Sequence, residues 1–349
     1  MTEDRVRAHG AEPGRIGRRG FIRGALAVGA ALGAGGRLFG GDEPAPKEAP
    51  KDAPKGPAAA AEPIFRISLA EWSLHRALGK GDLDTPGFVR AARDVYGLDA
   101  VEYVNSFLKR QVGDPAATAE LGKLCADTGV KSLLIMCDGE GRLGDPDEKA
   151  RATAVENHRK WLDMARALGC RSIRVNAASE GAREEQMKLA ADGLRRLAEL
   201  GAAQELDVIV ENHGGLSSDG SWLAGVMKAA AHPRLGTLPD FGNFHLGDGK
   251  WYDRYRGVEE LMPFARAVSA KSHGFDEAGN ETGTDYRRML RIVVGAGYRV
   301  HIGIEFEGDR IPEREGILAT KKLLERVRDE IAAERSGGTS KGPGTEEER

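Results

Sequence analysis

The sequence predicts an α/β protein whose folded part is a single (β/α)8 TIM barrel, and three observations favour this fold. Short β-branched runs alternate with longer amphipathic stretches, which is typical of parallel βαβ units. Eight such units of roughly 30 to 36 residues suit a barrel of ordinary size. The first strand is followed by no glycine-rich phosphate loop, so an open doubly wound sheet is less favoured.

The expected strands are short apolar runs at residues 65–69, 100–104, 132–137, 172–176, 207–211, 236–240, 267–273 and 301–306. The expected helices are amphipathic and cover residues 85–96, 115–128, 145–168, 183–200, 221–231, 257–265, 285–294 and 313–333. Thr85 before Pro86 predicts a capped helix start, and Gly129 and Gly169 each predict a helix end.

Residues 1–40 are expected to form an export signal. Arg18 and Arg19 precede the uncharged apolar run Gly24 to Gly36, an order typical of signal segments that use the twin-arginine route. The run is too short to span a bilayer, which needs about 20 apolar residues. No clear A-x-A cleavage site follows. Release into the periplasm and retention as an N-terminal membrane anchor therefore both stay open.

Composition divides the rest of the chain. Residues 41–63 are rich in Pro, Ala and Lys and predict a disordered linker, residues 64–334 the barrel, and residues 335–349 a disordered polar tail. The net charge is -3, and no basic cluster interleaves with aromatic residues, so nucleic acid is not favoured as a partner. Cys125, Cys137 and Cys170 form no C-x-x-C pair and are expected to be free, mostly buried thiols.

Four consecutive expected strands end in residues that can bind metal: Glu211, Asp240, His273 and Glu305. Charged groups are costly at the end of an apolar barrel strand unless they are paired or hold a metal. Active-site residues of barrels also come from this end of the strands. Three carboxylates and one imidazole suit Mn²⁺, Co²⁺ or Mg²⁺, with Zn²⁺ as a further candidate.

The strand-seven ligand has an alternative. Lys271 lies two residues before His273, so a register slip of two residues brings Lys271 to the same inward face.

The same residues predict a reaction class. Removing a proton next to a carbonyl or hydroxyl group needs a base, an acid on the opposite face and an electrophile for the developing oxyanion. Glu211 and Glu305, on non-adjacent strands, are the expected catalytic pair. Substrate contacts are expected from residues near the same strand ends, each of which also has an ordinary packing, turn or surface alternative: Trp72, Glu102, Asn176, His213, Asn243, His245 and Lys271.

Four motifs resemble the sugar phosphate isomerase/epimerase group of the xylose-isomerase-like barrel superfamily: Val-Glu-Asn-His-Gly-Gly, Leu-Pro-Asp-Phe-Gly-Asn-Phe, Ala-Lys-Ser-His-Gly-Phe-Asp and Gly-Ile-Glu-Phe-Glu-Gly. The resemblance implies one divalent metal held by Glu211, Asp240, His273 and Glu305, with both glutamates exchanging a proton with substrate carbon. Relatives often show His-x-Lys-Asp on strand seven. Aligning that lysine on Lys271 puts Ser269 in place of the histidine.

The expected function is a metal-dependent isomerase or epimerase of a free sugar or keto-sugar. Export makes a phosphorylated substrate less favoured, because such sugars are mainly cytoplasmic. A lyase or dehydratase of the inosose or 3-keto-glycoside type begins with the same proton abstraction and stays open, as does a non-catalytic carbohydrate-binding barrel. An endonuclease of the superfamily would need more histidine ligands and a basic DNA-binding face. A homo-oligomer is also left open, and membrane contact is expected only through an uncleaved signal segment.

Overall fold

The computed structural model describes residues 62–338. The expected export signal at 1–40 and almost all of the linker at 41–63 lie outside the described residues. Helix α10 (Glu313–Gly338) continues past residue 334, where the barrel was expected to end, and the rest of the expected tail, 339–349, lies outside the described residues. Glu334 near the end of the helix forms an ion pair with Arg291 at 2.6 Å, a contact that supports this extension.

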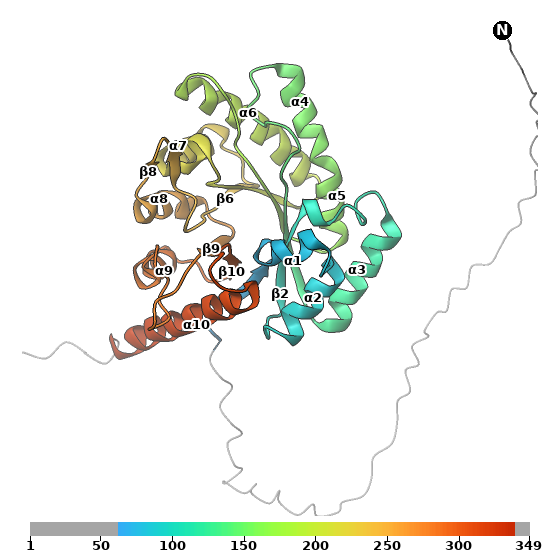
Figure 1. Ribbon diagram of the computed structural model, residues 1–349. Helices are drawn as coiled ribbons and strands as arrows, with labels where there is room; N and C mark the ends of the chain where they lie inside the picture. Colours follow the sequence, from blue (N-terminus) through green and yellow to red (C-terminus); the bar gives the residue numbers. More distant parts are fainter. Residues whose placement is uncertain (1–61, 339–349) are drawn as a thin grey trace, which may run out of the picture. The chain divides into compact units, whose positions relative to one another are not determined.

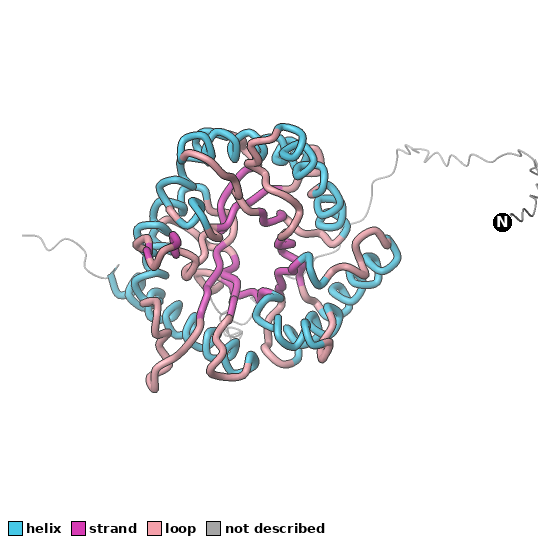
Figure 2. The backbone as a smooth tube through the Cα atoms, turned by 45° about the horizontal axis from the view of Figure 1, so that its top comes forward, coloured by secondary structure: helices cyan, strands magenta, loops and turns pink. Residues whose placement is uncertain are grey.

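Eight parallel strands form the barrel, which confirms the predicted fold class. Figure 2 shows them as a ring with the helices outside it. Strand order around the sheet is β6-β5-β4-β3-β2-β1-β10-β9, so the first and last units pair in parallel. The strands are β1 (Arg66–Ala70), β2 (Ala100–Val104), β3 (Lys131–Met136), β4 (Ser172–Val175), β5 (Asp207–Glu211), β6 (Leu235–Leu238), β9 (Val268–Ser272) and β10 (His301–Phe306).

A seam lies between β6 and β9, where the described residues show isolated bridges instead of a continuous ladder. One bridge joins Asp240 to Ser269. At that bridge the N–H of Ser269 donates to the carbonyl of Pro239 at 3.0 Å, and the N–H of Phe241 donates to the carbonyl of Ser269 at 3.1 Å. The seam therefore closes the barrel with few backbone hydrogen bonds.

The helices cover the outside of the strand ring (Figure 1). The larger ones are α2 (Thr85–Asp94), α3 (Pro115–Thr128), α4 (Glu148–Asn157), α5 (Arg159–Ala167), α6 (Arg183–Ala202), α7 (Gly220–Ala230), α8 (Arg254–Leu261), α9 (Tyr286–Gly295) and α10, with a short α1 (His75–Lys80) before them. Aspartates cap many of these helices by accepting backbone N–H groups, as Asp84 does for α2. Asp84 takes the capping role expected of Thr85, whose hydroxyl donates instead to the buried carboxylate of Glu71 at 2.8 Å.

Two elements differ from the sequence expectation. The helix expected over 145–168 is divided into α4 and α5 at His158, a buried histidine whose Nδ1 contacts the carbonyl of Ala154 at 2.7 Å. A small hairpin, β7 (His245–Gly247) and β8 (Lys250–Trp251), follows β6 and pairs antiparallel. Its few residues carry too little apolar pattern to have been predicted as strands.

The apolar core has two parts. The larger part lies between the outer faces of the strands and the helices. A smaller cluster consists of Ala70, Val104, Leu134, Met136, Ile209, Leu238 and Ala267. Several buried polar side chains lie on barrel strands, including Ser68, Glu102, Arg174, Ser269, Lys271 and Glu305. The expectation of free, buried thiols is confirmed for Cys125, Cys137 and Cys170. None of the helices within residues 62–338 has the length and apolar character needed to cross a bilayer.

Candidate active site

Three buried acids converge at the C-terminal end of the barrel strands, called the mouth below. Glu211 ends β5, Asp240 follows β6 by two residues, and Glu305 lies near the end of β10. Each offers one carboxylate oxygen, and these oxygens all lie within 4.8 Å of one another. We call this group the carboxylate cluster. The structure therefore brings together three of the four residues predicted to bind metal.

Glu211 is held from two sides. Its Oε2 forms an ion pair with Nε of Arg174 at 2.8 Å, and its Oε1 accepts a hydrogen bond from Nδ2 of Asn243 at 2.9 Å. Burial raises the pKa of Glu211 to about 7, against the lowering effect of the Arg174 charge, and the nearby Glu305 raises it further. Glu211 can therefore exchange a proton near neutral pH.

Asp240 lies in the tight turn that follows β6. Its Oδ1 accepts the backbone N–H groups of Gly242 and Asn243, both at 2.8 Å. The side chain of Asn212 fixes the same turn, with Oδ1 accepting the N–H of Asp240 at 2.8 Å and Nδ2 donating to its carbonyl at 3.0 Å. Burial raises the pKa of Asp240 to about 7. Its Oδ2 is buried and accepts no hydrogen bond from the described residues.

Glu305 is held by two residues of β9. Ser269 Oγ donates to Oε2 at 2.8 Å, and Lys271 Nζ lies 3.0 Å from Oε1. The ammonium group of Lys271 also lies 3.0 Å from Oε2 of Glu307. Burial works to lower the pKa of Lys271, but the negative charges of Glu305, Asp240, Glu211 and Glu307 together raise it above its ordinary value. Lys271 is therefore a buried cation inside the site.

His273 does not join the carboxylate cluster, which corrects its prediction as the fourth ligand. Its side chain is 57% exposed, and its Nε2 lies 3.9 Å from Oε2 of Glu307. The strand ends at Ser272, so the alternation expected to carry His273 inward stops before it. Ser269 and Lys271 pair in register with Gly303 and Glu305 instead. The alternative with Ser269 and Lys271 facing inward is the one the structure shows.

Arg174 is a site residue that the sequence reasoning missed. It is buried on β4 and joins Glu211 to Asp138, whose Oδ1 lies 2.7 Å from Nη1 of Arg174. Asn176, expected to contact substrate, donates from Nδ2 to the same Oδ1 at 2.7 Å. Burial opposes ionisation of Asp138, yet Arg174 and Asn176 hold its pKa below the ordinary value. Arg174 lies two residues before Asn176, so strand alternation was the signal that could have found it.

Trp72 and Glu307 form the edge of the site next to Lys271. The indole N–H of Trp72 donates to Oε1 of Glu307, and Lys271 contacts Oε2 of the same carboxylate. Burial raises the pKa of Glu307, but the Lys271 charge and these hydrogen bonds bring it below its ordinary value. The Trp72 ring stacks on His75 with 4.9 Å between ring centroids. Glu307, missed earlier, also follows from alternation, since it lies two residues after Glu305.

Glu102 lies deeper in the barrel than predicted. It is the third of five residues in β2, not its end, and its Oε1 accepts a hydrogen bond from Ser68 at 2.6 Å. It lines a cavity at the N-terminal end of the strands, called the base below, so its prediction as a substrate contact at the mouth is corrected. A Cβ on Gly303 would lie 2.6 Å from both Glu102 oxygens, so this glycine leaves room for the acid. Burial raises the pKa of Glu102 to about 7.

The two remaining histidine candidates lie in different places. His213 follows Glu211 by two residues, and burial together with the Arg174 charge lowers its pKa, whereas Asp138 raises it. His213 is exposed just beyond the end of β5, on the mouth side of the barrel. His245 is exposed on β7 and meets Trp251 edge to face, at 4.9 Å between ring centroids. No contact within residues 62–338 joins His245 to the carboxylate cluster.

The donor set of the carboxylate cluster suits a hard cation. Glu211, Asp240 and Glu305 offer only oxygen, and Asp240 Oδ2 is buried without a hydrogen-bond partner among the described residues. Carboxylate oxygens are preferred by Mg²⁺ and Mn²⁺, whereas sites for zinc usually include nitrogen or sulfur. Arg174 and Lys271 neutralise part of the negative charge of the cluster. Each would share its glutamate, Glu211 or Glu305, with a bound metal. The residues present therefore fit a divalent metal.

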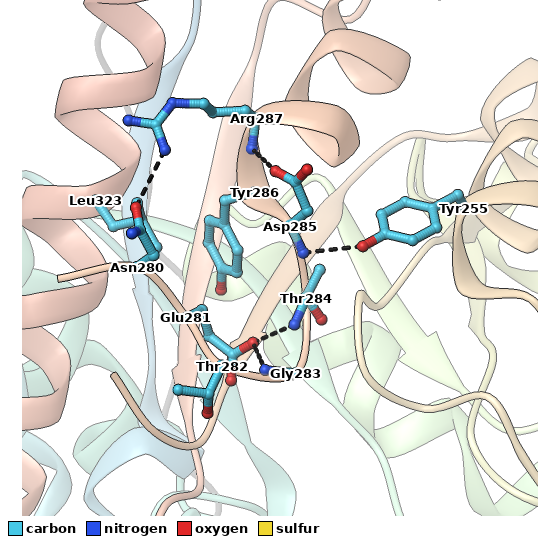
Figure 3. Close-up of a pocket in the computed structure, with 10 residues that line it drawn as sticks. All are labelled: Tyr255, Asn280, Glu281, Thr282, Gly283, Thr284, Asp285, Tyr286, Arg287 and Leu323. Atoms are coloured by element: carbon cyan, nitrogen blue, oxygen red, sulfur yellow. Dashed lines mark hydrogen bonds between the residues drawn. The ribbon is translucent and has the colours of Figure 1, made fainter. Parts of the chain in front are cut away.

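A separate pocket of about 500 Å³ lies beside α9 and is shown in Figure 3. One of its two acids, Glu281, accepts N–H groups from Gly283 at 2.7 Å and from Thr284 (Figure 3). The N–H of Asp285 donates to the Tyr255 hydroxyl at 2.9 Å. The members of the carboxylate cluster do not line this pocket. Its polar groups bind one another and fix the loop between β9 and α9.

Comparisons with known proteins agree with this architecture. Residues 89–327 match the family described as xylose isomerase-like TIM barrel. The structure is similar to that of a D-tagatose 3-epimerase-like protein, with TM-score 0.61 and 18% identity over 78% of this chain and 99% of the other. A sugar phosphate isomerase/epimerase from Parabacteroides distasonis gives TM-score 0.60 and 14% identity over 76% and 95%.

A xylose isomerase-like TIM barrel protein from Mycobacterium smegmatis, solved in complex with magnesium, gives TM-score 0.56 and 15% identity over 76% of this chain and 95% of the other. A search of curated protein sequences finds no match. The family match covers more than half of the sequence and agrees with the eight-stranded barrel. The chain belongs to the xylose isomerase-like TIM barrel family.

Proposed function

We propose that the protein is a divalent-metal-dependent enzyme that isomerises or epimerises a free sugar or keto-sugar by α-proton abstraction. The observation that carries this proposal is the carboxylate cluster, in which three buried acids on separate strands place oxygens within 4.8 Å of one another. Family membership and the epimerases among the similar structures support a sugar substrate. The same evidence supports enzymatic activity.

Glu211, Asp240 and Glu305 would hold the metal, and the oxygen-only donor set favours Mg²⁺ or Mn²⁺. When bound, a divalent metal supplies an electrophile that stabilises negative charge on a substrate oxygen. Asp240 acts only as a metal ligand in this proposal and takes no part in proton transfer. Two backbone N–H groups fix its Oδ1 and leave Oδ2 for the metal.

Glu211 and Glu305 are the proposed acid–base pair. One carboxylate takes the proton from the carbon next to the substrate carbonyl, and the other returns a proton to the opposite face or to the neighbouring carbon. Without a metal, burial raises the pKa of Glu211 to about 7, and a bound cation would lower it and favour the carboxylate that accepts the proton. Arg174 and Lys271 orient the two carboxylates through ion pairs of 2.8 Å and 3.0 Å. Trp72, fixed by Glu307, offers an aromatic face near the mouth for a sugar ring.

A second candidate is a lyase or dehydratase, and Lys271 favours it. An ammonium group 3.0 Å from Glu305 is a proton donor within the site, and elimination needs a donor to the departing oxygen. Proton abstraction by the same glutamates would begin both reactions. We also propose that the protein acts in the periplasm after twin-arginine export, which supports a substrate without phosphate.

The test is a screen of free and oxidised sugars in D₂O with the full-length chain, after removal of metal and after addition of Mg²⁺ or Mn²⁺. We expect metal-dependent deuterium incorporation at a carbon next to the carbonyl, without loss of water or aglycone, and loss of incorporation in Glu305→Gln. Elimination products would favour the lyase. Sugar binding without any metal-dependent exchange would contradict the enzyme and support a carbohydrate-binding barrel.

A further inference from the structure

A cavity of about 420 Å³ opens at the base of the barrel, opposite the carboxylate cluster. Its lining comes from residues of β1, β2, β3, β4 and β10, mostly at the start of each strand, and from the residues just before β4, β9 and β10. We call it the basal cavity. Because six units of the barrel contribute to one wall, the cavity is a product of barrel closure and not of a single loop.

The lining of the basal cavity is rich in basic side chains: Arg66, Lys131, Arg171, Arg266, Arg299 and His301. Three of these cations have acidic partners at long distances, with Arg66 to Glu62 at 3.4 Å, Lys131 to Asp99 at 3.7 Å and Arg266 to Asp207 at 3.5 Å. The three basic side chains are 44%, 55% and 39% exposed, and exposed pairs of this kind contribute only about 0–1 kcal/mol. They can turn toward a ligand at little cost.

Two further cations have no acidic partner within residues 62–338. Arg171 forms no ion pair or side-chain hydrogen bond with any described residue. Arg299 donates from Nη1 only to the carbonyl oxygens of Val294 and Tyr298, at 2.8 Å and 2.6 Å. The guanidinium of each therefore keeps donors for a ligand.

His301 supplies a neutral hydrogen-bonding group to the same cavity. Its Nε2 is buried and has no hydrogen-bond partner among the described residues. Burial lowers the pKa of His301, Asp99 raises it, and the charges of Arg66, Lys131 and Arg171 lower it again. The cations thus lie close enough to one another to act on one imidazole, and this imidazole lines the cavity with a nitrogen that no described residue satisfies.

We propose that the basal cavity binds a phosphate-type oxyanion, either free inorganic phosphate or the phosphate of a lipid headgroup. Arginine suits such a ligand because its planar guanidinium donates two parallel hydrogen bonds to one oxyanion. The acid at the inner end, Glu102, is buried with an unpartnered Oε2, and a protonated Glu102 can donate to the anion as well. The proposal is independent of the reaction at the mouth.

The experiment uses the full-length chain and inorganic phosphate as the probe, titrated in a calorimeter at constant ionic strength. We expect saturable binding that weakens at least about tenfold in Arg171→Gln and in Arg299→Gln, which is about 1.4 kcal/mol each. The matched control is Arg159→Gln, because Arg159 is similarly exposed at 46% but lies on α5 with Glu156 as its partner. The midpoint of thermal unfolding of each variant confirms that it folds.

A second arm separates the two sources of phosphate. Flotation with phosphatidylcholine vesicles, with and without phosphatidylglycerol, compares the wild-type chain with Arg171→Gln, so any contribution of the N-terminal segment is common to both. Loss of free-phosphate binding in the variant assigns the site to soluble phosphate. Loss of binding only to the anionic vesicles assigns it to a headgroup. Absence of both kinds of binding, or equal loss in Arg159→Gln, overturns the proposal.

Discussion

The charged side chains at the two ends of the barrel differ in burial and in how closely they are paired. At the mouth, Glu211, Asp240 and Glu305 are buried, and Arg174 and Lys271 meet them at 2.8 Å and 3.0 Å. In the basal cavity, Arg66, Lys131 and Arg266 are exposed by about half and meet their acids at 3.4 Å to 3.7 Å. Arg171 and Arg299, in the same cavity, have no acidic partner among the described residues. Burial and close ion pairs fix the positions of the carboxylates at the mouth before any ligand binds. A reaction at a single substrate carbon requires such fixed positions. The base leaves its side chains free to adapt, which is sufficient for binding.

The largest expected effect lies at the mouth. Glu305→Gln keeps the hydrogen bond from Ser269 but removes the proton-accepting carboxylate, so turnover should fall roughly 10²- to 10⁴-fold. Deuterium exchange into substrate measures it. Glu325→Gln on α10, which removes an exposed carboxylate paired with Lys321 at 2.7 Å, is the control and should keep full activity. Retention of most activity in Glu305→Gln would show that the mouth is not catalytic.

The next effect compares a buried pair with an exposed one. Arg174→Met leaves Glu211 and Asp138 without their shared cation and should lower the free energy of unfolding by about 3–5 kcal/mol. Arg234→Met at the base removes an exposed arginine paired with Asp207 at 3.3 Å and should cost about 0–1 kcal/mol. Urea unfolding measures both. Equal losses would mean that the two ends do not differ in how burial fixes their charges.

Glu102, between the two ends, gives a pH dependence. Its pKa is about 7 in the folded protein and 4.5 as an ordinary glutamate, so the folded state keeps a proton that the unfolded chain releases. Its contribution to stability is fully present below pH 4.5 and is lost as the pH rises through 7. In wild type the free energy of unfolding should therefore decrease as the pH rises from 4.5 to above 7. Glu102→Gln should make this decrease smaller by on the order of 1–3 kcal/mol.

Unfolding free energies at several pH values, on wild type and Glu102→Gln after metal removal, test this prediction. Glu325→Gln should keep the wild-type slope. A slope unchanged by Glu102→Gln would place the titration on another buried acid, such as Glu71, whose pKa burial also raises to about 7.

The smallest expected effect concerns His273. Since its side chain is 57% exposed and outside the carboxylate cluster, His273→Ala should change the dissociation constant for Mn²⁺ less than about twofold. Asp240→Asn should weaken Mn²⁺ at least about tenfold, because even outer partners of metal ligands contribute that much. Calorimetry with each ion provides the measurement. A large loss in His273→Ala would restore the histidine as a ligand.

The barrel fold and the positions of the three acids could both be predicted from the sequence, for the same physical reason. Strand periodicity and helix amphipathicity are local, and the C-terminal ends of successive barrel strands meet at one mouth whatever the details of the loops. The ranges expected for β2 and β5 agree with the structure residue for residue. Glu211, Asp240 and Glu305 then follow from topology.

His273, Glu102 and Arg174 show what local pattern leaves out. Ending β9 one residue early removed His273 from the inward face, and sequence pattern places such ends only to within a few residues. Glu102 was assigned to a strand end when it lies at mid-strand. Alternation indicates the inward face for Arg174, but not which carboxylate its long side chain reaches. The basal cavity combines residues from six units, so no single segment carries its signal.

The seam between β6 and β9 has a consequence for the dynamics of the barrel. With few backbone hydrogen bonds across it, this is where the strand ring should open first, and the N–H groups of Ser269 and Phe241 should exchange with solvent faster than those of the continuous ladders. Asp240 lies on one side of the seam and Glu305 on the other. A metal ion bound by both residues would join the two sides of the seam. Metal binding and closure of the strand ring would then be thermodynamically coupled.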